Sequence, residues 1–354
     1  MSSSNAEHPV QASTFREEIA EQPEVAARLL EQMPAFARIG AAIKAAEPAG
    51  IMIAARGSSD HAAIYAKYVF QLRNRLPVAL AAPSLFTNYG VAPAIGRYCV
   101  MGISQSGASP DVIAVIAEAR RQGALTIAVT NHGDSRLAET AEHVIPLNAG
   151  EERSVPASKT YTATLIAIAL LSLAMHPEAG LEAGLRAVPD AMRLAISGEA
   201  AAAEMAAALA ASRLIVIGRG FNLSTAEELA LKLMETSYVL ARAWSAADFM
   251  HGPVAIIDGD LPLLVIETQG PTFADGRQIA DQLLAKGARV FQLSDGTPPL
   301  AGSTAAVLLR SGLPESLTPL PLTVAAQLFA YHLALARGLD PDQPRALKKV
   351  TRTW

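Results

Sequence analysis

A run of small polar residues in the first third of the chain combines groups that could bind an anion. Ser104-Gln105-Ser106-Gly107-Ala108-Ser109 follows an apolar stretch and precedes a helical one that starts at Pro110. Its hydroxyls, its amide and the free N–H groups of a helix start could hold a dianionic phosphate, and the helix dipole would add to the attraction. Ser109 and Pro110 would also suit the N-cap and first position of that helix, and both interpretations can hold together. Ser58 and Ser59 lie in a turn after the preceding strand and could face the same ligand.

Acid–base groups occur at helical spacing in the second half of the chain. Lys232 and Glu235 are three residues apart and would share one face of a helix over 226–238. Glu228 and Lys232 are four apart and could instead form an ordinary surface ion pair. His251 follows in a His-Gly-Pro turn, where a histidine can be structural or catalytic. A carboxylate, an ammonium and an imidazole together would suit general acid–base chemistry.

The C-terminal segment, 342–354, allows two interpretations. Two adjacent lysines, Lys348 and Lys349, are typical of a solvated chain end. The apolar residues Leu347 and Val350 suggest instead that the segment docks onto another part of the protein.

The elements that must position these groups occur twice. Apolar runs end in glycine turns at Gly57 and Gly107, and again at Gly220 and Gly270, with an offset of 163 residues in both pairs. The offset is the same, or differs by one, for the later strands of each half. The expected strands and their turns are 51–57, 99–103, 123–131 and 143–147, matched by 215–220, 263–266, 287–294 and 306–310. Four strand–turn units with one offset indicate an internal duplication.

Continuous apolar strands are buried on both faces, as in parallel sheets covered by helices. We therefore expect an α/β protein with two duplicated three-layer αβα domains, each with a parallel sheet flanked by helices. Helices are expected over 14–32, disturbed by Pro23, and over 34–46, with alanine-rich helices over 181–211 joining the halves. The predicted divisions are an N-terminal helical segment 1–47, domains 48–195 and 196–338, and a C-terminal tail 339–354.

Composition excludes several classes of protein. The 354 residues have a net charge of −4 and a pI near 6.0, which argues against nucleic acid as a partner. The single cysteine, Cys99, lies in an apolar run and is expected to be an inert core residue. The N-terminus lacks the pattern of a signal peptide, and the apolar run 163–175 is too short to span a membrane. A cytoplasmic location without membrane contact is expected.

The motifs, in this order, resemble the tandem sugar-isomerase (SIS) family. Within it they are most similar to the isomerase half of glutamine–fructose-6-phosphate aminotransferase and to stand-alone glucosamine-6-phosphate deaminases. The resemblance rests on 57–59, 104–107, 152–160, 229–235, 251–253 and 342–345 with Lys349. It implies the SIS fold and an enzyme of phosphorylated amino sugars that needs no metal or redox cofactor.

The resemblance also implies roles for individual residues. Glu235 would move a proton between C1 and C2 of the sugar, with Lys232 beside it. His251 would open the sugar ring from across the interface of a homodimer, and Lys349 would lie over the open sugar. Phosphate-binding and sugar-contacting residues would be Ser59, Ser104, Gln105, Ser106 and Ser109, and Val155 and Ala157, respectively. Arg56 stands where the aminotransferase commonly has cysteine.

The expected activity is conversion of glucosamine 6-phosphate and water to fructose 6-phosphate and ammonia. Residue 2 is serine, whereas the glutaminase of the aminotransferase uses an N-terminal cysteine, so no glutaminase domain is expected. A galactosamine-6-phosphate deaminase and a fructosamine-6-phosphate deglycase are alternatives of the same class. A non-catalytic sugar-phosphate sensor is a further alternative, although it would not need Glu235, His251 and Lys349 together.

Overall fold

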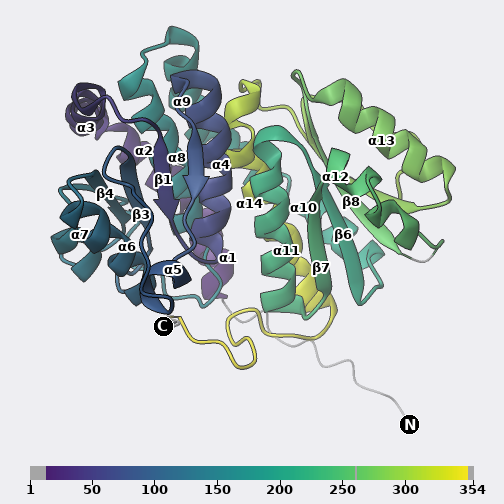
Figure 1. The fold of residues 1–354 in the computed structure, drawn as a ribbon. Coiled ribbons are helices and arrows are strands. Elements are labelled where there is room, and N and C mark those ends of the chain that lie inside the picture. The colour runs from purple at the N-terminus through teal and green to yellow at the C-terminus, as the bar shows by residue number, and fades with distance from the viewer. Residues whose placement is uncertain (1–12, 260, 350–354) are drawn as a thin grey trace.

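The computed structural model describes residues 13–259 and 261–349, which form two α/β halves side by side (Figure 1). Each half contains one five-stranded sheet in which every pairing is parallel. The first sheet has the order β2-β1-β3-β4-β5, and its strands are Ile51–Ala54 (β1), Val78–Leu80 (β2), Cys99–Ile103 (β3), Leu125–Thr130 (β4) and His143–Pro146 (β5). The second has the order β7-β6-β8-β9-β10, with Arg213–Gly218 (β6), Leu240–Ser245 (β7), Pro262–Thr268 (β8), Arg289–Asp295 (β9) and Ala306–Leu309 (β10). The matching strand orders confirm the duplicated three-layer α/β architecture.

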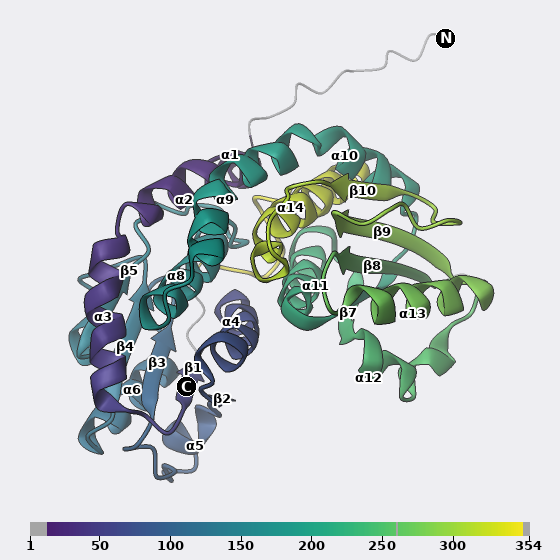
Figure 2. The same ribbon diagram turned by 90° about the horizontal axis from the view of Figure 1, so that it is seen from above.

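Four helices separate the two sheets (Figure 2). Ser58–Asn74 (α4) and Lys159–Met175 (α8) come from the first half, and Leu223–Ser237 (α11) and Pro319–Ala336 (α14) are their counterparts in the second. α4 packs against α11, and α8 packs against α14. The α4–α11 contact brings the two halves of the chain together at the centre of the molecule.

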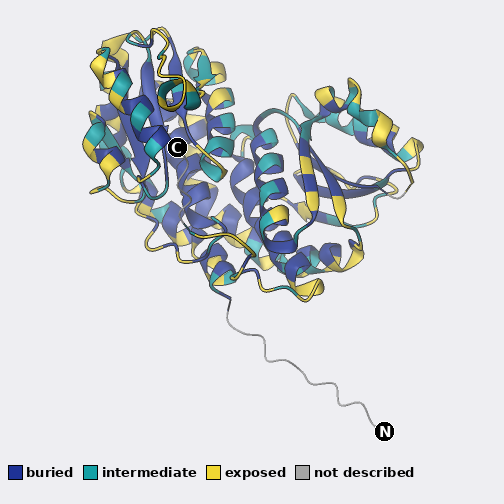
Figure 3. Ribbon diagram, turned by 60° about the horizontal axis from the view of Figure 1, so that its bottom comes forward, coloured by how far each residue is buried: buried dark blue, intermediate teal, exposed yellow. Residues whose placement is uncertain are grey.

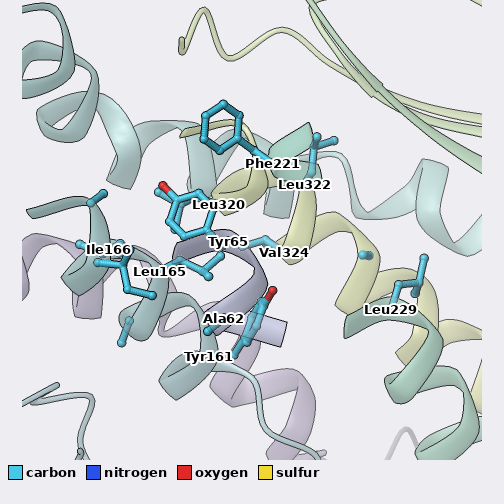
Figure 4. Packing of buried hydrophobic residues seen from close by; sticks show 14 of the residues in the cluster. Ala62, Tyr65, Tyr161, Leu165, Ile166, Phe221, Leu229, Leu320, Leu322 and Val324 are labelled. Atoms are coloured by element: carbon cyan, nitrogen blue, oxygen red, sulfur yellow. The ribbon is translucent and has the colours of Figure 1, made fainter. Parts of the chain in front are cut away.

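The central helices form one core that is shared by both halves. Figure 4 shows Tyr65 of α4, Tyr161 and Leu165 of α8, and Leu229 and Leu320 of the second half in this core. α8 and α14 are buried on all sides by neighbouring helices and strands. Apolar residues on every face are typical of a helix in the middle of a protein. Among the described residues, 315–336 is the one stretch with the length and composition of a membrane span, and 83% of its most apolar 18 residues is buried inside the protein.

The remaining helices lie on the outer faces, where the burial colours change from dark blue to teal and yellow (Figure 3). Smaller apolar clusters fill the space between each sheet and its outer helices. The outer elements are Ser84–Thr87 (α5), Pro110–Arg121 (α6), Arg136–Thr140 (α7), Ala246–Met250 (α12), Phe273–Ala285 (α13) and the single turn Pro253–Ile256. The single turns Gly220–Asn222 and Glu315–Leu317 lie instead at the shared core, where Phe221 and Leu317 are buried. The N-terminal and joining helices are Thr14–Ala20 (α1), Gln22–Leu30 (α2), Met33–Ala46 (α3), Ala179–Ser197 (α9) and Glu199–Ala208 (α10).

Several local expectations can be compared with the structure. The expected helix over 14–32 is two helices, because Pro23 falls in the first turn of α2, where a missing N–H costs nothing. The strands expected from apolar runs are all present, whereas β2 and β7 were not expected. Cys99 is fully buried in β3, and burial raises the pKa of its thiol to about 12, as an inert core residue requires.

The core assignment of α14 predicts unequal effects for two leucines of the same helix. Leu328 is fully buried, whereas Leu335 is 43% exposed. Leu328→Ala should destabilise the protein by about 2–5 kcal/mol, because it leaves a cavity in a closed core. Leu335→Ala should change the free energy of unfolding by less than about 1 kcal/mol. Urea denaturation of both variants measures this, and equal midpoints would contradict the assignment.

Candidate active site

Two glycine turns shape the polar cradle at the ends of β1 and β3. Gly57 has φ 55° and Gly107 has φ 61°, a conformation that side chains rarely adopt. Ser109 takes the N-cap position of α6, and Pro110 its first turn, but the Ser109 hydroxyl makes no capping bond. It lies 3.1 Å from the Ser104 hydroxyl instead. The hydroxyl is thus kept within the cradle and does not serve the helix.

One cavity of about 350 Å³ joins this cradle to the second half of the chain. Every residue that the sequence predicts for the site lines it, except His251. The lining set from the first half is Ser58, Ser59, Ser104, Gln105, Ser106, Ser109, Val155 and Ala157, and that from the second half and the tail is Lys232, Glu235 and Lys349. The cavity is also lined by Arg56, Gly57 and Glu152, which were not predicted as site residues.

Lys232 carries a deeply buried charge at the wall of the cavity. Its ammonium lies 2.5 Å from the Glu235 carboxylate and 3.5 Å from that of Glu228. The side chains of Lys232 and Glu228 are each 1% exposed, so the interpretation of this pair as a surface ion pair is wrong. Glu235 retains 21% exposure, which leaves part of this carboxylate side chain accessible in the cavity.

The first half supplies further partners for these buried charges. Glu228 accepts a hydrogen bond from Ser58 at 2.9 Å and lies 2.8 Å from Nδ1 of His61, both on α4. Burial disfavours the Glu228 carboxylate, but Lys232, His61 and Ser58 outweigh burial and lower its pKa. Burial likewise disfavours the Lys232 ammonium, but Glu228 and Glu235 outweigh burial and raise its pKa to about 12. Lys232 therefore remains a cation at neutral pH.

The loop with Val155 and Ala157 has no strand partner and is held by two buried carboxylates. Glu152 accepts hydrogen bonds from the backbone N–H groups of Ser158 and Thr160 at 2.9 and 3.0 Å. Glu18 of α1 accepts hydrogen bonds from the backbone N–H groups of residues 153 and 154. Neither carboxylate was predicted from the sequence to have a role, although acidic groups near a helix N-terminus are generally stabilising and Glu152 lies shortly before α8.

The tail docks onto the protein, but through polar groups. Lys349 donates to Glu152 and to the carbonyl of Ser154, both at 2.7 Å. Asp342 accepts hydrogen bonds from the first backbone N–H groups of α1 at 2.9 and 2.7 Å. Leu347, which was expected to anchor the segment, is 41% exposed, and Val350 lies outside the described residues.

His251 lies away from the cavity of its own chain. It follows α12 on an exposed turn, and its Nδ1 is 2.8 Å from the carbonyl oxygen of Ala247. Because Nδ1 makes this contact, Nε2 is the ring nitrogen that could interact with another molecule. The expectation that His251 serves a second chain stays a prediction.

Fold and cavity together define a tandem α/β protein in which one half offers a polar cradle and the other a buried cluster of charged side chains. The SIS domain model matches residues 46–174 and 209–337, so the chain belongs to the SIS domain family. Glutamine–fructose-6-phosphate aminotransferase of Bradyrhizobium diazoefficiens is 32% identical over 350 residues, which cover 94% of this chain and 57% of that protein. The chain thus spans little more than half the length of this relative.

Solved structures agree with this relationship. A Silicibacter pomeroyi protein assigned as a phosphosugar isomerase is 35% identical, with a TM-score of 0.83 over 94% of this chain and 100% of its own. Glucosamine-6-phosphate deaminase from Thermotoga maritima shares the fold, with a TM-score of 0.76 over 96% of this chain and 100% of its own, at 18% identity.

The buried charges predict a coupled effect on stability. Glu228→Gln should destabilise the protein by about 1–3 kcal/mol at pH 7, because it leaves the buried Lys232 ammonium with one carboxylate partner in place of two. Adding Lys232→Met should cost less than the sum of the two single substitutions. Glu227→Gln, one residue away on α11, serves as the matched control. Denaturant unfolding measures all four variants, and additive effects would show that the pair is not coupled.

Proposed function

We propose that this protein is an isomerising glucosamine-6-phosphate deaminase, which converts glucosamine 6-phosphate and water to fructose 6-phosphate and ammonia. The observation that carries the proposal is the single cavity between the Ser104–Ser109 loop and Glu235. In the proposed complex, the Ser104–Ser109 loop binds the phosphate group of the substrate, and the sugar extends from there toward α11. A hexosamine phosphate has its anion at C6 and its reacting carbons at the opposite end, which matches this arrangement.

The reaction needs a ring-opening group and one base that reaches two carbons. His251 of a second chain opens the ring to the aldehyde. Glu235 removes the proton from C2, which gives an enolamine, and returns a proton to C1. The product is an imine at C2, and water adds to it and expels ammonia. The oxygen of that water becomes the keto oxygen of fructose 6-phosphate.

Lys232 acts electrostatically in this mechanism. The pKa of about 12 means that its nitrogen has no free electron pair at neutral pH and cannot attack the sugar aldehyde. A fixed ammonium beside Glu235 can stabilise negative charge that develops on O1 during proton transfer. Lys349, bound to Glu152 at 2.7 Å, is a second cation at the cavity wall.

An end-product assay tests the proposal. Purified protein is incubated with glucosamine 6-phosphate, and ammonia and fructose 6-phosphate are measured separately. Release of both in equal amounts is the expected result. Release of ammonia and tagatose 6-phosphate from galactosamine 6-phosphate alone would move the assignment to the other epimer. Release of glucose 6-phosphate and the amine from a fructosamine 6-phosphate alone would move it to a deglycase. Binding without any turnover would indicate a sensor.

Glu235→Gln should separate chemistry from binding. Loss of the base should lower turnover by at least about 100-fold, because general acid–base catalysis contributes that much or more. The affinity for glucosamine 6-phosphate should change little, since the phosphate cradle stays intact. Calorimetric titration and initial rates measure the two effects, and a variant with ordinary turnover would remove Glu235 from the mechanism.

The cross-chain role of His251 can be tested by mixing two inactive variants. Glu235→Gln and His251→Asn chains are dissociated, mixed in equal amounts and reassembled. If each site takes His251 from its partner, half of the dimers are mixed and have one intact site, so about a quarter of the original activity should return. Failure to recover activity although mixed dimers form would show that His251 acts within its own chain or not at all.

A further inference from the structure

The second half repeats the cradle of the first half, residue by residue. The offset of 163 pairs an arginine, two glycines and a hydroxyl residue between the two halves: Arg56, Gly57, Gly107 and Ser109 match Arg219, Gly220, Gly270 and Thr272. Both arginines pair with an aspartate at the start of the next outer helix. Arg56 Nε lies 2.6 Å from Asp111, and Arg219 lies 2.9 Å from Asp275. The glycines of the second cradle also keep positive φ.

One position differs in what its side chain does. Glu152 and Glu315 are counterparts at the same offset. Glu152 turns back to the N-terminus of α8 and leaves the first cavity open. The Glu315 carboxylate instead reaches into the second cradle, where the Thr272 hydroxyl donates to it at 2.5 Å. Thr272 is the counterpart of Ser109, so a carboxylate occupies the place that faces the ligand in the first half.

The contact between Glu315 and the cradle is tight. A Cβ added at Gly270 would collide with the Glu315 carboxylate, so no side chain fits between them. Glu315 Oε1 would lie 3.6 Å from a Cβ at Gly220, which places the carboxylate between both glycine turns. Tyr65, fully buried beside the start of α14 (Figure 4), donates to the carbonyl of Ser316 at 2.8 Å. This bond fixes the backbone next to Glu315.

The second cradle also lacks acid–base partners. By the same offset, the counterparts of Glu228, Lys232 and Glu235 on α4 are Tyr65, Val69 and Leu72. None of these can supply a carboxylate base or a cation. The second half therefore retains the glycine turns and the hydroxyl residue of the first cradle, but it has no acid–base groups that could act on a sugar.

We propose that the Glu315 carboxylate stands where a phosphate group would bind in the second cradle, and that each chain therefore holds one phosphate ester. The assignment of phosphate to the first cradle comes from the proposed function. Glu315 excludes a phosphate both by volume and by like charge. Its removal should expose a site for a phosphate monoester or inorganic phosphate, formed by the Thr272 hydroxyl, the loop backbone and Arg219.

The test counts inorganic phosphate bound per chain by equilibrium dialysis. The wild-type protein should bind one phosphate, and Glu315→Ser should bind two. Ser106→Ala weakens the first cradle, so the Ser106→Ala, Glu315→Ser double variant should keep the new site alone. Glu204→Ser removes an exposed negative charge on α10 and should leave the count at one. Turnover of Glu315→Ser should stay within about twofold of wild type, because Glu315 lies outside the catalytic cavity.

A count of one for Glu315→Ser, or of two for the wild-type protein, would overturn the proposal. If Glu315→Ser does not fold, Glu315→Asn shortens the side chain by one methylene and removes the charge, and phosphate should then raise its melting temperature in the Ser106→Ala background. No such rise would also overturn it. If Ser106→Ala does not weaken phosphate binding to the first cradle, that result contradicts the proposed function. The number of phosphates bound by Glu315→Ser would still decide the role of Glu315.

Discussion

The buried ammonium of Lys232 is the constraint on which the site depends. A charge with 1% exposure is tolerated when carboxylates compensate it, and Glu228 and Glu235 do so from the same helix. Spacings of four and three residues put all three charges on one face of α11. That face packs against α4, where Ser58 and His61 complete the polar contacts. The same contact that satisfies the charge therefore joins the two halves of the chain.

Duplication explains why one contact can build a site from two domains. The helices α4 and α11 occupy equivalent places in their halves, so their meeting brings the strand ends of one half toward a helix of the other. The arrangement offers two such places, one per cradle. Side chains have diverged on both helices and at Glu152 and Glu315, and the divergence leaves one open cavity with acid–base groups.

The sequence predicts the fold where a strand is buried on both faces. Runs such as Cys99–Ile103 have no polar residue and were identified with the bounds that the structure has. Two of the four edge strands, β2 and β7, were missed for a physical reason. In β7, exposed Leu240 and Arg242 alternate with buried Ala241 and Ala243, so no continuous apolar run marks the strand. β2 has only three residues, none of them buried.

The site was predictable in its parts, because polar turns after parallel strands converge at one edge of a sheet. The burial of Glu228 and Lys232 was not predictable from their spacing, since an exposed helix shows the same pattern. Burial depends on α4, which lies more than a hundred residues earlier in the chain. Glu152 was missed for a similar reason, because its partner Lys349 is 197 residues away.

The loop that completes the cavity is held by segments outside both repeats. Asp342 in the tail binds the start of α1, Glu18 at the end of that helix holds the backbone of 153 and 154, and Lys349 binds Glu152. Burial raises the pKa of Glu18 although the carboxylate accepts two backbone hydrogen bonds. Burying this charged group therefore costs free energy of desolvation that the hydrogen bonds do not fully offset. Neither 46–174 nor 209–337 contains these three residues. The side of the cavity formed by Val155 and Ala157 therefore depends on the first helix and the tail as well as on the two SIS repeats.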